Sequence, residues 1–514
     1  MGIGIVVLIF SYTTYLGYIM PRMVRLKHLT LLAFSALLTH CAVGPNFQSP
    51  DAPNVCDYTE TPLPRKTLST KGVHGGKSQY YVNGQDVCAS WWELFHSPDL
   101  NVLIQRGFDN SPTLDAAKAT LEQAQQNLRA QFGALMLPAL SAQGNAQRQQ
   151  FTGAGFGTPN NNPTIFNIIN SQLDVSYTFD IFGGSRRQLE ALAATVDYQQ
   201  FQLEAAYLTL STNIVTAVIN ESSYRAQMEA TKELIAFQEK LLKITQQQFE
   251  LGAQNRTAVL AQQTQLAQTR ALLPPLENSL AQTRHALAVY MGEFPSENSA
   301  PAFNLKSLTL PECLPVSLAS NLVRQRPDVR AAEALLHQAS ANVGVATAAL
   351  LPQVTLTGNA GWQANQLNDL FAPQSFLWSI ASGFMQPIFQ GGSLVAKRRV
   401  AIAAYEQADA QYRQVVLQAF QNVADTLRAL QFDAEALQAQ SLAETSARET
   451  LKMIEEQFRL GAVNYIDLLD AEQQVLQSMI NRIKAQAARY IDTATLYSAL
   501  GGGWWNSEDE DEEA

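Results

Sequence analysis

The sequence carries little charge. Asp, Glu, Lys and Arg make up 16% of its 514 residues, and the formal net charge is −10. Six of the negative charges lie in the C-terminal run 508–513, so the rest of the chain is close to neutral. Domains that bind nucleic acids carry a basic patch or stripe, and the sequence has none. We therefore expect no nucleic-acid partner, and we expect the acidic run to be a solvated end.

Residue patterns for enzyme chemistry are also missing. The six histidines form no HExxH spacing, and no GxSxG motif is present. The stretch Lys71–Ser78 resembles a phosphate-binding loop, but Lys71 stands where that motif needs its first glycine. The sequence therefore predicts no enzyme activity, no metal site and no cofactor.

Two apolar stretches precede the body of the chain. Residues 2–20 carry no charge, and are either a membrane helix or, as we favour, sequence upstream of a true start at Met20 or Met23. From Met23 onward, two basic residues precede the apolar run 29–38, which is typical of a secretory signal. The signal ends at Cys41 in a sequence similar to a bacterial lipobox, in which the cysteine is lipidated, and Ala42 after it implies sorting to the outer membrane. An ordinary cleavable signal is the alternative.

Three cysteines remain after Cys41. Export permits a disulfide between Cys56 and Cys88, and free thiols at Cys56, Cys88 and Cys313 are the alternative. Residues 42–90 are rich in Pro, Gly, Thr and Ser, which predicts an extended arm with little regular structure.

Glycine and proline are absent from two very long stretches. Residues 185–251 and 393–460 span 67 and 68 residues, and each lies between glycines. Ala, Leu, Gln and Glu dominate them, and these residues favour helices. One helix of that length is ~100 Å long, far beyond the ~11–12 residues of an average globular helix.

The two long stretches belong to an internal repeat. Pro112 matches Pro327, Leu137-Pro138 matches Leu351-Pro352, and Phe249–Ala253 matches Phe458–Ala462, at an offset near 210. In each half the first proline can open a helix, and Leu-Pro can end it. We interpret this pattern as a duplication.

Strands are predicted between the short and the long helix of each half. Residues 173–181 alternate apolar and polar without a fault, which indicates a strand with one apolar and one polar face. The candidates in the second half are 354–357 and 376–389, and 140–150 is a weaker candidate in the first. The predicted fold class is mixed α and β, with two repeats of helix, strand, strand, long helix and helix.

Four strands cannot close a membrane barrel, because such barrels start at eight strands and open edges cannot face lipid. Three chains would supply 12 strands. In such a barrel Val175, Tyr177, Phe179 and Ile181 would face lipid, while the residues between them would face a water-filled lumen: Asp174, Ser176, Thr178 and Asp180. A soluble β-layer fits these strands locally, but it does not explain an export signal together with such long helices.

These features together resemble the TolC-type outer-membrane efflux proteins, and specifically the lipoprotein branch that includes OprM and NodT. The resemblance is carried by the Pro-opened repeats, the paired Phe-x-Leu-Gly-Ala turns, the segment Cys41–Phe47 (CAVGPNF) and the segment Leu496–Trp504 (LYSALGGGW). It covers the chain from about Cys41 to Trp504.

The resemblance implies a homotrimer. Its strands would form one 12-stranded β-barrel in the outer membrane, continued by a periplasmic α-helical barrel. It further implies a passive conduit of a tripartite efflux system that exports drugs or other small toxic molecules. Its partners would be a periplasmic adaptor protein and an inner-membrane pump, most simply of the RND type. The alternatives are the exit duct of a type I protein secretion system and a coiled-coil, adhesin-like protein without a pore.

The resemblance also assigns roles to residues at the predicted turns. The docking site for the adaptor would consist of Phe249, Leu251, Gly252, Phe458, Leu460 and Gly461. The periplasmic aperture would be lined by Asp467 and Asp470, with Arg459 and Tyr465 as candidate bridges between chains. A simple helical cap at each turn and two solvated aspartates are the alternative.

The chain is thus expected to consist of five segments along its length. These are a signal region (1–40), a lipidated extended arm (41–95), a first efflux repeat (96–295), a second efflux repeat (296–503) and an acidic tail (504–514).

Overall fold

The computed structural model describes residues 42–55, 57–152 and 163–506. The chain divides into two compact units. Unit 1 comprises residues up to 48 together with 125–194 and 336–407, and unit 2 comprises 49–124, 195–335 and the chain from 408 onward. Each half of the sequence therefore contributes to both units.

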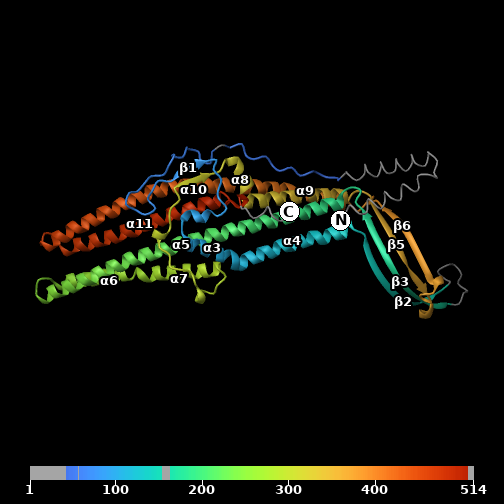
Figure 1. The fold of residues 1–514 in the computed structure, drawn as a ribbon, viewed down its shortest axis with the longest axis horizontal. Coiled ribbons are helices and arrows are strands. Elements are labelled where there is room, and N and C mark those ends of the chain that lie inside the picture. Colours follow the sequence, from blue (N-terminus) through green and yellow to red (C-terminus); the bar gives the residue numbers. More distant parts are fainter. Residues whose placement is uncertain (1–41, 56, 153–162, 507–514) are drawn as a thin grey trace. The chain divides into compact units, whose positions relative to one another are not determined.

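Two helices of 67 residues dominate the secondary structure: α5 (Gly184–Glu250) and α10 (Ser393–Arg459) (Figure 1). Their bounds agree with the glycine- and proline-free stretches to within one residue, so the prediction is confirmed. Within the described ranges, no helix combines the length and the apolar character needed to cross a membrane.

The helix that opens each repeat begins at the predicted proline. These helices are α4 (Pro112–Met136) and α9 (Pro327–Ala348), and both end just before Leu-Pro. Proline is suited to the first turn, where its missing N–H has no intrahelical partner to lose. The predicted order of helix, strand, strand, long helix and return helix is confirmed in both halves.

The return helix differs between the halves. In the second half it is continuous, α11 (Tyr465–Ala499). In the first half it is divided into α6 (Arg256–Arg270) and α7 (Leu273–Tyr290), so the expectation of one helix there is wrong. Pro274 and Pro275 cannot donate to the preceding turn, and they fit only at the start of a new helix.

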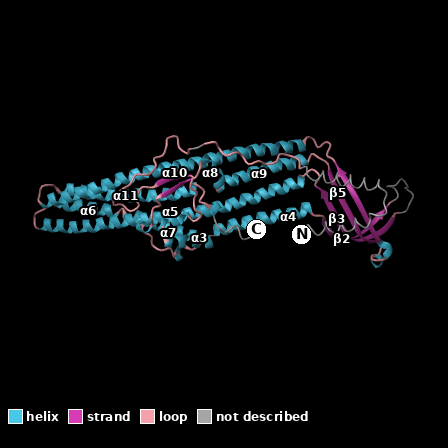
Figure 2. Ribbon diagram, turned by 45° about the horizontal axis from the view of Figure 1, so that its top comes forward, coloured by secondary structure: helices cyan, strands magenta, loops and turns pink. Residues whose placement is uncertain are grey.

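Unit 1 contains a four-stranded antiparallel sheet in the order β2-β3-β5-β6 (Figure 2). Its strands are β2 (Ala139–Phe151), β3 (Thr164–Phe179), β5 (Gln353–Ala364) and β6 (Phe376–Met385). All four predicted strands exist, but β5 is much longer than predicted. β6 stops before Phe389 because Pro387 has no N–H for a ladder.

Unit 2 contains structure that the sequence did not reveal. β1 (Tyr80–Asn83) pairs in parallel with β4 (Cys313–Val316), so the predicted arm is not wholly irregular. Two further helices are α3 (Pro98–Asn110) and α8 (Ala319–Gln325). Short 3-10 helices of unit 2 occupy Trp91–Phe95, Pro295–Glu297, Leu305–Ser307 and Trp504–Asn506, whereas Leu367–Asp369 and Pro373–Ser375 are 3-10 helices of unit 1.

The core of unit 2 is built around aromatic side chains from the N-terminal arm. Trp91 and Phe95 have no exposed area. The Trp91 ring stacks on Tyr497 of α11 at a centroid distance of 5.6 Å, and the Phe95 ring stacks on Tyr490 at 6.3 Å. The arm is thereby packed onto the last helix of the second repeat.

Candidate functional site

The sheet of unit 1 separates polar from apolar side chains. Residues directly opposite each other in an antiparallel pair lie on one face. One row of the register joins Leu140, Val175, Gly358 and Ile380, and the adjacent row joins Ser141, Asp174, Asn359 and Ser379. The alternation predicted for one strand therefore continues across all four.

The polar face carries three of the four residues predicted for the lumen, namely Asp174, Ser176 and Thr178. Gln172 donates from Nε2 to Asp174 Oδ1 at 2.9 Å, and the hydroxyls of Thr178 and Thr355 lie 3.2 Å apart. These contacts link neighbouring positions along and across strands, so the face is a hydrogen-bonded polar surface.

The fourth residue, Asp180, lies beyond the end of β3, so its assignment to the strand is wrong. Its carboxylate accepts the main-chain N–H groups of Ser185 at 3.0 Å and Arg186 at 2.9 Å, and it pairs with the Arg186 side chain. Carboxylates at a helix N-terminus satisfy N–H groups that have no intrahelical partner. Asp180 therefore fixes the start of α5.

The other face of the sheet is apolar, and none of the described residues covers its largest side chains. The exposed fraction is 69% for Leu140, 67% for Trp378 and 71% for Ile380. β2 and β6 each have one sheet neighbour among the described residues, so their outer edges are unpaired. A large apolar surface next to open edges marks a surface that needs a partner or a lipid environment.

The segment after Cys41 is held on unit 1 by a buried arginine. Arg187 of α5 donates to Asn46 Oδ1 at 2.6 Å and to the main-chain oxygen of Val43 at 3.2 Å, and it pairs with Glu190 at 2.7 Å. Gly44 has φ +97°, and a Cβ there would lie 2.5 Å from the Cα of Gly344. The motif Ala42–Phe47 is therefore a segment shaped to fit α5 and α9; Cys41 itself lies outside the described residues.

Phe47 completes this attachment. Its ring stacks on His337 of α9 at a centroid distance of 4.4 Å, and His337 Nε2 lies 3.0 Å from Glu190 Oε1. The arm, α5 and α9 are thus joined by one polar and aromatic network.

The disulfide prediction remains untested. Cys88 and Cys313 are exposed free thiols in the described part of the chain, and Cys56 lies outside it.

The two turns in unit 2 have the geometry that the glycines predict. Gly252 and Gly461 both have φ +74°, a region that other residues avoid. Leu251 is 85% exposed and Leu460 is 78% exposed, and Phe249 is also exposed. Phe458 instead packs against Tyr465, with ring centroids 5.7 Å apart. Each turn thus presents an apolar side chain to solvent.

The predicted aperture residues do not act together within one chain. Asp467 forms a capping box with Asn464, in which each side chain accepts the other's main-chain N–H at 3.1 Å. Asp470 is exposed, and Arg459 pairs with Glu456 at 2.6 Å. Tyr465 is 7% exposed, packs in the apolar cluster with Leu468 and Leu469, and has a pKa raised by burial. Within one chain Tyr465 is therefore a packed residue, and its bridge to a second chain stays a prediction.

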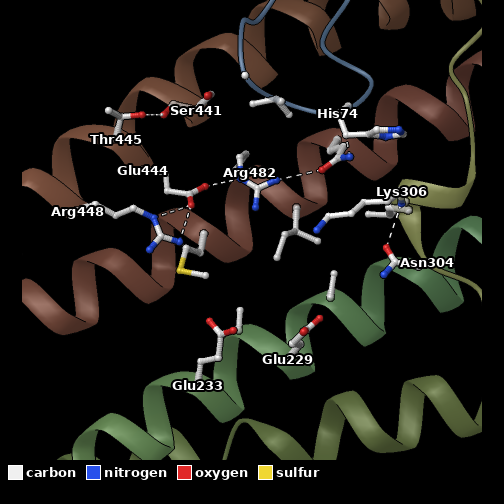
Figure 3. Close-up of a pocket in the computed structure, with 18 of the residues that line it drawn as sticks. His74, Glu229, Glu233, Asn304, Lys306, Ser441, Glu444, Thr445, Arg448 and Arg482 are labelled. Carbon is white, nitrogen blue, oxygen red and sulfur yellow. Dashed lines mark hydrogen bonds and ion pairs between the residues drawn. The ribbon is translucent and has the colours of Figure 1, made fainter.

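A cavity of about 600 Å³ in unit 2 was not foreseen (Figure 3). On one side Glu444 of α10 accepts from Arg448 Nε at 2.9 Å and also from Arg482 of α11. On the other side α5 presents Glu229 and Glu233. The pairing of Glu444 with Arg482 spans 38 positions in the sequence, so no local pattern could reveal it.

The described residues contain no group of three or more His, Cys, Asp and Glu side chains suited to hold a metal ion. The described residues do present a two-faced sheet, two apolar turns and a charged cavity wall.

Comparison with known proteins agrees with this geometry. The profile of the family described as "Outer membrane efflux protein" matches residues 103–293 and 318–502. The probable outer membrane lipoprotein SilC of Salmonella typhimurium is 28% identical over 94% of this chain and 100% of its own length. The toluene efflux pump outer membrane protein TtgC of Pseudomonas putida is 28% identical over 93% of this chain and 96% of its own. The cation efflux system protein CusC of Escherichia coli K12 is 26% identical over 91% and 97%.

Solved structures are similar as well. The outer-membrane channel OprN superposes with a TM-score of 0.81 at 26% identity, covering 90% of this chain and 100% of its own. The open state of the Neisseria gonorrhoeae MtrE outer membrane channel gives a TM-score of 0.76 at 27% identity, covering 91% and 99%.

Proposed function

We propose a function from one premise: the chain belongs to the outer membrane efflux protein family. It is an outer-membrane protein, as the sequence predicts. The proposed function is that of a passive trimeric conduit, the outer-membrane component of a tripartite efflux system for small toxic molecules. Its proposed partners are a periplasmic adaptor and an inner-membrane pump of the RND type.

The observation that carries this proposal is the four-stranded sheet with one apolar face and two unpaired edges. Three copies joined edge to edge would give a closed barrel of 12 strands, which removes every open edge. The apolar face with Ile380 would then meet lipid. The polar face with Asp174, Ser176 and Thr178 would line a water-filled lumen.

The attachment of the N-terminal segment supports a lipid anchor at Cys41. Arg187 and His337 hold residues 43–47 on unit 1, which is the unit that contains the sheet. A lipid on Cys41, only two residues before Val43, would be tethered close to that attachment.

The turns are the proposed docking site for the adaptor. Phe249, Leu251 and Leu460 are exposed apolar side chains next to left-handed glycines, and clustered exposed apolar groups mark sites of protein–protein interaction. Phe458 would contribute indirectly, because it supports the turn from within.

Asp470 is the residue proposed to line the periplasmic aperture, while Asp467 is engaged in the capping box with Asn464. In a threefold trimer the Asp470 carboxylates would form a ring that concentrates cations. For Asp470→Asn, we expect block of the channel by trivalent cations in planar bilayers to weaken at least about tenfold. The control is Glu449→Gln, which removes an exposed carboxylate on α10 instead of α11. It should leave block of the channel unchanged. Equal block in Asp470→Asn and the native protein would exclude the ring.

The proposed function is tested by deleting the gene and measuring both drug susceptibility and protein secretion. We expect greater sensitivity to dyes, detergents or antibiotics, with secretion unchanged. Lost secretion with unchanged sensitivity would instead indicate a type I secretion duct. Purified trimers that never conduct in planar bilayers would exclude both conduits.

A further inference from the structure

Three polar side chains are completely buried where the two helical hairpins of unit 2 meet. Gln238 on α5, Gln262 on α6 and Glu472 on α11 each have no exposed area. Gln238 Nε2 donates to Glu472 Oε2 at 3.3 Å, and Gln262 Nε2 donates to the main-chain oxygen of Gln238 at 3.1 Å. The first contact joins the α5–α6 hairpin to α11 beside the apolar cluster around Leu468, and the second lies within the α5–α6 hairpin.

The cluster has more acceptors than donors. Gln238 Oε1, Gln262 Oε1 and Glu472 Oε1 are all buried without a hydrogen-bond partner. A buried acceptor without a donor is costly. An ionised carboxylate can only accept, whereas a protonated one also donates an O–H. A proton on Glu472 therefore supplies a donor that the cluster lacks.

The surroundings of Glu472 also favour the protonated form. α5 brings the neutral Gln238 to it, and α10 brings the carboxylate of Glu455 near it. Its own helix contributes the buried Tyr465, and Gln262 of α6 reaches the cluster through the main chain of Gln238. Burial, followed by the repulsion from Glu455, raises the pKa of Glu472 to about 7, against the opposing hydrogen bond from Gln238. The ion pair between Glu239 of α5 and Arg270 of α6 lies at exposed positions.

We propose that Glu472 is a proton-binding site that holds the α5–α6 and α10–α11 hairpins together when occupied and loosens their packing when empty. When Glu472 loses its proton, water stabilises the ionised carboxylate. Water can reach the carboxylate only if α11 moves away from α5 and α6. The hairpins carry the turns at Gly252 and Gly461, so the packing of the helices next to these turns would respond to pH. This packing lies within one chain, so its response to pH does not depend on whether the protein transports small molecules.

The direction of the effect follows from the raised pKa. The closed state binds the proton more tightly than an open state, in which the pKa returns toward its ordinary value of 4.5. The packing is therefore strongest at acidic pH, and it weakens as pH rises from about 4.5 to about 7. The equilibrium constant for local opening should rise about tenfold per pH unit in that window and level off above it.

Amide hydrogen exchange of the full-length protein tests this directly. After correction for the intrinsic pH dependence of exchange, peptides around Gln238, Gln262 and Glu472 should open about twentyfold more at pH 7.5 than at pH 5.5. Glu472→Gln keeps the shape and supplies an N–H donor. It should hold opening at pH 7.5 within about twofold of its value at pH 5.5. The control Glu239→Gln removes an exposed carboxylate next to Gln238 and should keep the native pH profile.

A second variant keeps the test decisive if Glu472→Gln does not fold. Glu455→Gln removes the nearby negative charge, so the pKa of Glu472 should fall and the midpoint of the profile should move to lower pH. The local readout excludes a contribution from Asp433 and Asp492, another buried acid pair on α10 and α11 with raised pKa values. The proposal would be overturned by a native pH profile in Glu472→Gln or by an unshifted midpoint in Glu455→Gln. Protection against exchange that changes with added Ca²⁺ at fixed pH would also overturn it.

Discussion

Replacing Arg489 with alanine should lower the free energy of unfolding of unit 2 by about 3–5 kcal/mol. The Arg489 side chain has no exposed area. It donates to the main-chain oxygen of Lys77 at 2.7 Å, to Thr67 Oγ1 at 2.9 Å and to the main-chain oxygen of Gly75 at 3.0 Å. Alanine would remove the Arg489 donors from the main-chain oxygens of Lys77 and Gly75 in the interior, while Thr67 Oγ1 would keep the main-chain N–H of Gln79.

The measurement is denaturant unfolding of the detergent-solubilised protein, followed through tryptophan fluorescence, because Trp91 reports on the core of unit 2. Arg459→Ala is the matched control. Its guanidinium is exposed and paired with Glu456, so the change should stay within about 0.5 kcal/mol. Arg489→Lys keeps the charge but cannot reproduce the several directed N–H donors of the planar guanidinium. It should therefore cause most of the loss in unfolding free energy expected for Arg489→Ala. An Arg489→Ala protein as stable as Arg459→Ala would show that the arm is held by its aromatic contacts alone.

Arginine at position 380 should prevent assembly in the membrane, whereas arginine at position 379 should be tolerated. Ile380 lies on the apolar face of β6 and is 71% exposed, while Ser379 lies opposite Asn359 on the polar face. A lipid-facing arginine near the bilayer midplane costs about 2–4 kcal/mol per chain. A trimer would carry three.

These two variants differ by one position on one strand, so they separate the faces without changing the residue introduced. The readouts are the amount of trimer recovered from outer membranes and its resistance to dissociation on heating. Equal loss in Ser379→Arg and Ile380→Arg would indicate a general defect of the strand, and equal tolerance would contradict the lipid-facing assignment.

Local chemistry explains which predictions succeeded. The ends of α5 and α10 could be read from the sequence because Gly252 and Gly461 adopt left-handed conformations that other residues avoid. The faces of the sheet could be read because side chains alternate with a period of two. Pro274 and Pro275 also encode the division of the first return helix, because neither has an N–H for a continuous helix.

The end of β3 was placed wrongly because a helix cap competes with the strand for one carboxylate. Asp180 continues the alternating pattern of β3, but the strand ends before it. Its carboxylate instead accepts hydrogen bonds from the first N–H groups of α5. The packing of Tyr465 against Phe458 could not be read from the sequence, and its bridge between chains stays a prediction.

The sequence by itself determined the duplication, the two 67-residue helices and a sheet with one polar and one apolar face, since each is encoded by local periodicity, proline and glycine. Only the tertiary structure decided that Arg187 holds the N-terminal segment, that Arg489 holds the following arm, and that Glu472 is buried with two glutamines. Lone polar residues on long helices look alike in sequence. Their roles differ because partners hundreds of positions away determine which of them lose contact with water and which groups replace it.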